Sequence, residues 1–157
     1  MQNCFKKYNY LSLSLVESLL KTRKQLLMDY YNLIGFKPQK KKIQAIDETT
    51  LINFCSHLLD YLSYGHFYVY TRILENCKSH FLKPKNSFIA KIICTLQNNT
   101  QYIMKLYDIY LCIIINDDNY LDFQNALSKV GEALTSRFIL EDQLINRVNI
   151  SQFIKSQ

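Results

Sequence analysis

The chain has 157 residues, a formal net charge of +6, and only three glycines and two prolines. Its hydrophobic fraction of 48% is too high for a disordered chain, and its length suits one domain with a core of its own. So few turn-forming residues favour a small number of long helices over many short strands. We therefore predict a single all-α domain over residues 1–157, loose at residues 1–10 and 149–157.

Neither a secreted nor a membrane-spanning protein is expected. Polar residues interrupt positions 8–20 after the early lysines, and no cleavage site of small residues follows. The longest candidate span, residues 109–115, is far too short to cross a membrane. We expect a soluble protein of the cytoplasm.

The cysteines are odd in number and widely spaced, with no CxxC pair. A metal site needs clustered ligands, and a disulfide framework usually needs even pairing. We therefore expect reduced cysteines, most of them in the core, and neither a metal nor another cofactor. The five are Cys4, Cys55, Cys77, Cys94 and Cys112.

The first long helix is expected over residues 12–34, after a short N-terminal helical arm. Gly35 suits its C-terminal cap, and Pro38 stands shortly beyond. Apolar residues at helical spacing predict which side of this helix faces the core. They are Val16, Leu20, Leu27, Tyr31 and Ile34.

The second helix is expected from an N-cap at Asp47 to about residue 78. Gly65 lies inside it and predicts either a kink or a place where another helix or a partner comes close. One face is a core stripe of Leu51, Cys55, Leu58, Leu62, Val69 and Ile73. The opposite face sets one carboxylate among aromatic rings, which is typical of a contact surface; it carries Asp60, Ser63, Tyr64 and Phe67. The alternative is that this face packs on another helix of the same bundle.

Two further helices are expected over residues 87–115 and 120–148. A turn closed by Pro84 precedes the first, and Asn116, Asp117 and Asp118 make a turn between them. Because all connections are short, consecutive helices should be antiparallel. The predicted fold is an up-down-up-down four-helix bundle. The apolar stripes are Ile89, Ile92, Leu96, Ile103, Leu106 and Tyr110, then Tyr120, Phe123, Leu127, Val130, Leu134, Phe138 and Ile145.

No catalytic site is expected. The chain lacks a glycine-rich phosphate loop and the HExxH, GxSxG and ExxH motifs, and its three histidines share no ligand spacing. His57 and Asp60 are i, i+3 neighbours, for which a helix-surface pair is the favoured interpretation. A nucleophile built from Cys55 and His66 is disfavoured, because a thiolate in the core stripe would be costly.

Several segments closely resemble the Rsd/AlgQ family of bacterial regulators of sigma D, which are anti-sigma factors. The resemblance keeps the same order and nearly the same spacing from about Glu17 to Leu144. The segments are RKQLLMDYYNLIGFKP (residues 23–38), NFCSHLLDYLSYGHFYVYTRIL (53–74), NTQYIMKLYD (99–108) and DNYLDFQNALSKVGEALTSRFILEDQLI (118–145).

This resemblance implies a one-to-one complex with region 4 of the housekeeping sigma factor, the part that reads the promoter −35 element. Binding there would block the contacts of sigma with core RNA polymerase and with DNA. It also implies that Asp60 accepts a hydrogen bond from an arginine of that helix-turn-helix module. Around Asp60 we place Ser63, Tyr64 and Phe67, and further out His66, Arg23 and Tyr30. A weak homodimer of the free protein is left open, and no membrane partner is expected.

The charge distribution keeps a different class of function open. Residues 1–45 hold nine Lys and Arg against two acids, whereas residues 106–157 hold seven acids against four bases. A basic nucleic-acid-associated regulator would use the lysine cluster of Lys37, Lys40, Lys41 and Lys42. We attribute the charge to composition and do not expect direct DNA binding. A third interpretation is an adaptor for another cytoplasmic protein.

Overall fold

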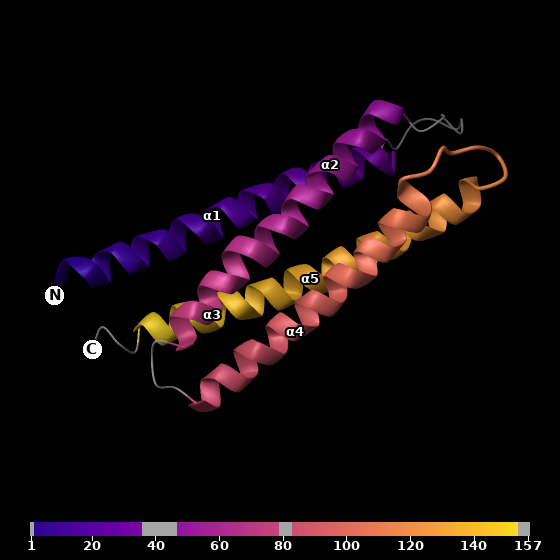
Figure 1. Cartoon of the computed structure of the whole chain (residues 1–157). Coiled ribbons are helices and arrows are strands. Elements are labelled where there is room, and N and C mark those ends of the chain that lie inside the picture. Colours follow the sequence, from indigo (N-terminus) through magenta and orange to yellow (C-terminus); the bar gives the residue numbers. More distant parts are fainter. Residues whose placement is uncertain (1, 36–46, 79–82, 154–157) are drawn as a thin grey trace. The chain divides into compact units, whose positions relative to one another are not determined.

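Helices account for almost all of the residues described by the computed structural model, which are residues 2–35, 47–78 and 83–153. Side chains are described for residues 14–35, 47–75 and 88–147. These residues include no β-strand, so the all-α prediction is confirmed (Figure 1). In chain order the helices are α1 (Gln2–Leu33), α2 (Glu48–Tyr64), the π-helix η1 (Gly65–Tyr70), α3 (Thr71–Lys78), α4 (Lys83–Leu106), the π-helix η2 (Tyr107–Leu111) and α5 (Tyr120–Phe153).

The chain divides into two compact units, residues 1–71 and 72–157. In the first unit, α1 packs against α2 and η1, and the two long helices are antiparallel (Figure 1). In the second unit, α4 and η2 pack against α5, again antiparallel (Figure 1). Each unit thus contains a helical hairpin with its own apolar seam, and the second unit also includes almost all of α3. The single domain and the four-helix bundle stay predictions.

Several boundaries differ from those expected. Residues 2–10 belong to α1 and form no separate arm. Helix α4 begins at Lys83, so Pro84 lies in the first helical turn, where its missing N–H costs nothing. The helical run from α4 ends at Leu111, which leaves residues 112–115 in the loop. Helix α5 continues to Phe153, beyond the predicted end at residue 148.

The buried side of α1 lies one residue away from the predicted stripe. Its buried residues recur every seven positions, at Leu19, Leu26 and Leu33. The predicted stripe was wrong. Of its residues, Val16 and Leu27 are half-buried, and Leu20, Tyr31 and Ile34 are exposed. One residue corresponds to a rotation of about 100°. Helix α1 thus has two adjacent apolar stripes, and periodicity alone does not say which one meets α2.

The other stripes are largely confirmed. Leu51, Leu58, Leu62, Val69 and Ile73 are buried, as are all predicted positions of α4 itself. Tyr110, Tyr120, Phe138 and Ile145 are only half-buried, and the fully buried Phe54 and Tyr61 were missed.

The expected core placement of the cysteines was wrong where side chains are described, because Cys94 and Cys112 are exposed and Cys55 is half-buried. Cys4 and Cys77 lie outside the described side chains.

Asp47 caps the start of α2, as predicted. One of its carboxylate oxygens accepts hydrogen bonds from the backbone N–H of Thr50 at 3.1 Å and from the Thr50 hydroxyl at 2.7 Å. These two bonds favour the charged form and lower the pKa of Asp47 below its usual value.

We expect Asp47→Ala to lower the melting temperature of the protein at neutral pH, because a backbone N–H of α2 loses its acceptor. A group with a lowered pKa stabilises the fold above its unfolded-state pKa, and this contribution disappears as the pH falls through the lowered value. The difference in melting temperature between wild type and variant should therefore shrink below about pH 4. A difference that is the same at pH 3 and pH 7 would contradict a role for the charged cap.

Candidate functional site

The predicted contact face of α2 and η1 is open to solvent. Asp60 and Ser63 are exposed, and Phe67 has 66% of its surface exposed. Tyr64 and His66 are half-buried. Within the described part of the chain, Asp60 forms no hydrogen bond or ion pair. A carboxylate without a local partner beside open aromatic surface has the composition of a protein-binding site.

The π-helix η1 explains why aromatic side chains protrude here. Its hydrogen bonds are one residue longer than those of an α-helix, so one additional residue fits into the turn. Phe67 and Tyr68 bulge outward, 66% and 62% exposed, whereas Val69 and Tyr70 return to the core. Gly65 begins this turn, so the expected irregularity at the glycine takes the form of a π-helix. Turns of this kind occur frequently at functional sites.

Ring contacts order the protruding side chains before any partner binds. Tyr64 and Tyr68 stack with ring centroids 5.6 Å apart and planes at 26°. His66 and Phe67 meet edge to face at 4.9 Å. Aromatic side chains that are already held in place lose little conformational freedom on binding. The surface formed by Asp60, Ser63, Tyr64, Phe67 and Tyr68 is called the Asp60 surface below.

A polar pair beside this surface joins α1 to α2. Nδ1 of His57 lies 2.5 Å from Oδ2 of Asp29, and Gln25 donates a hydrogen bond to the other carboxylate oxygen of Asp29 at 3.2 Å. His57 therefore pairs with Asp29 of α1, and the expected surface pair with Asp60 was wrong. The contact joins α1 and α2 one helical turn before Asp60. It could not be found from sequence, because 28 positions separate the partners.

The two predicted residues of α1 differ in their position around the helix. Tyr30 is half-buried and its ring lies 5.7 Å from that of Phe54 in α2. Arg23 is half-buried and stands about 120° around α1 from Asp29, on the other side of Leu26. The flank of α1 that carries Asp29, rather than the flank of Arg23, thus meets the Asp60 side of α2. The involvement of Arg23 and Tyr30 stays a prediction.

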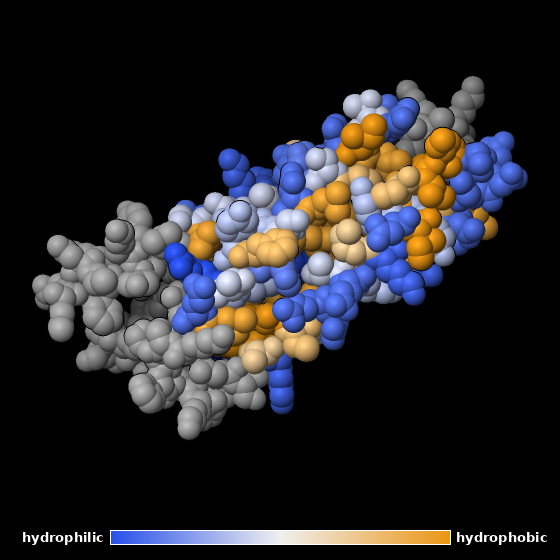
Figure 2. Space-filling model, viewed as in Figure 1, coloured by the Kyte–Doolittle hydropathy of each residue, from blue (hydrophilic) through white to orange (hydrophobic). Residues whose placement is uncertain are grey.

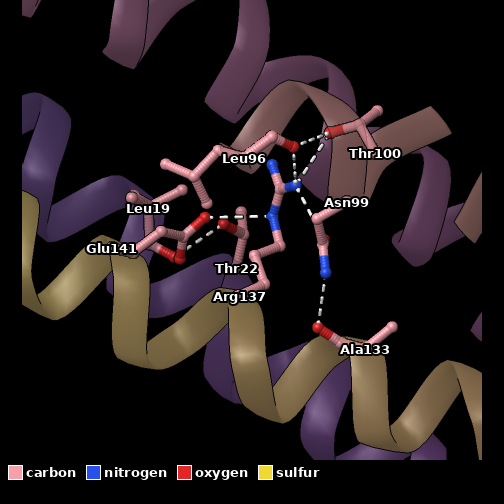
Figure 3. Close-up of polar contacts among 8 residues, drawn as sticks. All are labelled: Leu19, Thr22, Leu96, Asn99, Thr100, Ala133, Arg137 and Glu141. Atoms are coloured by element: carbon pink, nitrogen blue, oxygen red, sulfur yellow. Dashed lines mark hydrogen bonds and ion pairs between the residues drawn. The ribbon is translucent and has the colours of Figure 1, made fainter. Parts of the chain in front are cut away.

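A buried polar network in the second unit was missed by sequence reasoning (Figure 3). Arg137 and Glu141 of α5 are fully buried and form an ion pair at 3.1 Å. Arg137 also donates to Thr100 at 2.8 Å, and Asn99 donates to the Ala133 carbonyl at 2.8 Å. The polar residues 98–100 lie within the continuous helix α4. This network fixes the register of α4 against α5.

Other candidate chemistry has no support in the described residues. They contain no group of three or more His, Cys, Asp and Glu side chains placed to hold a metal ion. None of their helices is long and apolar enough to span a membrane. The lysine cluster Lys37, Lys40, Lys41 and Lys42 lies outside the described residues. Figure 2 shows apolar patches among hydrophilic ones on the face in view, which again suits protein binding.

Comparison with known proteins gives a consistent result. The family model described as "Regulator of RNA polymerase sigma(70) subunit, Rsd/AlgQ" matches residues 3–149. A protein of Pectobacterium atrosepticum named Regulator of sigma D is 46% identical over 135 residues, which are 86% of this chain and 88% of that protein. A protein of the same name from Yersinia pseudotuberculosis serotype O:1b is 49% identical over 131 residues, 83% of this chain and 77% of that protein.

Proposed function

Because the chain belongs to the Rsd/AlgQ family of regulators of the RNA polymerase sigma(70) subunit, we propose that it is an anti-sigma factor that binds region 4 of the housekeeping sigma factor. The complex is one-to-one, and it keeps sigma from core RNA polymerase and from the −35 promoter element. This role requires binding and no catalysis, and the family is one of regulators rather than enzymes. We place the protein in the cytoplasm, where its partner works.

The observation that carries this proposal is the exposed carboxylate of Asp60 beside the bulged aromatic residues of η1. Region 4 presents arginine and lysine side chains for DNA, and these carry a positive charge. An arginine that leaves DNA or solvent for Asp60 gains a charge-assisted hydrogen bond. Phe67 and Tyr68 then exclude water around this bond and supply apolar contact area. Local charge matters here more than the net charge of +6.

Titration calorimetry of the purified protein with region 4 tests the proposal directly. We expect a one-to-one complex with micromolar or tighter affinity, and the absence of binding at micromolar concentrations would refute the proposal. Asp60→Ala should weaken the complex by about 1–3 kcal/mol if the carboxylate meets an arginine.

The matched control is Glu132→Ala, which removes an exposed carboxylate from α5 in the second unit. It should leave the affinity unchanged. A similar loss in both variants would mean that the carboxylates act only through the overall field of the protein. An unchanged affinity in Asp60→Ala would show that Asp60 lies outside the interface. The anti-sigma role itself would then be decided by whether the wild-type protein binds region 4.

A further inference from the structure

Exposed apolar side chains occur in η2, in the loop that follows it and in the first turn of α5. Ile114 is 89% exposed, more than any other large apolar side chain among the described residues. Leu121, in the first turn of α5, is 67% exposed, and Ile109 and Ile113 are also exposed. We call these four residues the Ile114 surface. It lies in the second unit, whereas the Asp60 surface lies in the first.

Hydrogen bonds hold this loop in its shape. The side-chain amide of Asn119 donates to the Ile114 carbonyl oxygen at 2.9 Å, and its side-chain oxygen accepts the backbone N–H of Asn116 at 2.9 Å. The side-chain oxygen of Asn116 in turn accepts the backbone N–H groups of Asp118 and Asn119, each at 3.1 Å. The turn therefore fixes Ile114 next to the start of α5. A loop that is already ordered gives up little entropy when a partner binds.

The segment that carries the Ile114 surface is acidic, and the exposed Lys105 and Lys129 lie just outside it on either side. Residues 106–128 contain four aspartates and no Lys, Arg, Glu or His. All four, Asp108, Asp117, Asp118 and Asp122, are exposed. The segment carries a formal charge of −4 in a chain of net charge +6, so the remainder carries +10. Four exposed aspartates in the segment that carries these exposed apolar residues favour a basic partner over an acidic one.

We propose that the Ile114 surface binds a basic amphipathic helix of a partner protein. The apolar face of that helix covers Ile114 and Leu121, and its Lys and Arg side chains meet Asp117, Asp118 and Asp122. Binding of an amphipathic helix through spaced apolar anchors is a common mode of recognition. The inference does not depend on the Asp60 surface or on sigma binding.

The test uses the full-length protein and a fluorescein-labelled synthetic peptide of about five helical turns, composed of Leu and Lys in an amphipathic pattern. A matched peptide carries Glu at every Lys position. Fluorescence anisotropy should show tighter binding of the Lys peptide by about tenfold or more, and this preference should weaken with added salt. Equal affinity for the two peptides would overturn the proposal.

Substitutions locate the binding. Ile114→Ser with Leu121→Ser should weaken the Lys peptide by about tenfold or more, because each side chain loses apolar contact area. The control Ile139→Ser alters an isoleucine of α5 that is 55% exposed, and it should leave the affinity unchanged. An unchanged affinity in the Ile114 and Leu121 variant, or an equal loss in the control, would refute the assignment.

Charge reversal gives a gain of function that loss of folding cannot imitate. Asp117→Lys with Asp118→Lys should make the protein prefer the Glu peptide. Retained preference for the Lys peptide would contradict the charge argument.

Sedimentation velocity tests whether the Ile114 surface binds a second copy of the chain instead. A wild-type dimer that disappears in the Ile114 and Leu121 variant would overturn the proposal.

Discussion

Replacing Arg137 by alanine is expected to lower the free energy of unfolding by about 3–5 kcal/mol, because the buried carboxylate of Glu141 would lose the cation that pairs with it. Both side chains are fully buried, and the guanidinium also serves Thr100 and Asn99 of α4. Alanine cannot replace any of these hydrogen bonds, so the buried oxygens of α4 lose a donor as well. Urea denaturation followed by circular dichroism measures the effect.

Two further variants separate this explanation from a general effect of removing positive charge. Lys129→Ala alters an exposed cation on the same helix and should change the free energy of unfolding by less than about 0.5 kcal/mol. Arg137→Met combined with Glu141→Leu removes both charges and should recover much of the loss, because no unpaired ion remains. A loss below about 1 kcal/mol in Arg137→Ala would mean that water reaches Glu141 in the variant.

The buried network also illustrates the limits of sequence reasoning. Arg137 and Glu141 are spaced i, i+4, which usually indicates a pair on an exposed helix face. Arg137 also contacts Asn99 and Thr100, almost forty positions earlier, and local spacing does not reveal such a contact. The helices themselves were predictable, because apolar periodicity extends over many turns and scarce glycine and proline allow few breaks. The stripe of α1 was misplaced because two neighbouring apolar stripes have the same period.

The Asp60 surface was predictable in part for similar reasons. A carboxylate and aromatic residues opposite a core stripe identify a face of a regular helix, and Asp60, Ser63 and Phe67 are exposed. The π-helix was not predictable, because Gly65 indicates an irregularity without saying that one additional residue enters the turn. Tyr68 was therefore overlooked, although it is 62% exposed and stacks on Tyr64. The pair of Asp29 and His57 required the packing of α1 against α2.

On the proposed function, Phe67→Ser combined with Tyr68→Ser should weaken the complex with region 4 by about 3–5 kcal/mol, which is roughly a hundredfold or more. An aromatic side chain buries about 150–250 Å² when it becomes fully covered, so two of them dominate a small interface. Both rings are largely exposed in the free protein, and their loss should leave the melting temperature nearly unchanged. Calorimetry with region 4 measures the affinity.

The control for this pair is Tyr102→Ser, which removes a tyrosine of α4 that is 47% exposed and should not affect binding.

Combining Asp60→Ala with Phe67→Ser then tests whether the charge and the rings act on the same partner side chains. Neighbouring contacts in one interface are usually non-additive by about 0.5 kcal/mol or more. A smaller combined loss than the sum is expected, because Phe67 excludes water from the bond to Asp60. Losses that add within about 0.5 kcal/mol would assign Asp60 and Phe67 to separate contacts. No loss for the aromatic variant would instead place the sigma contact away from η1.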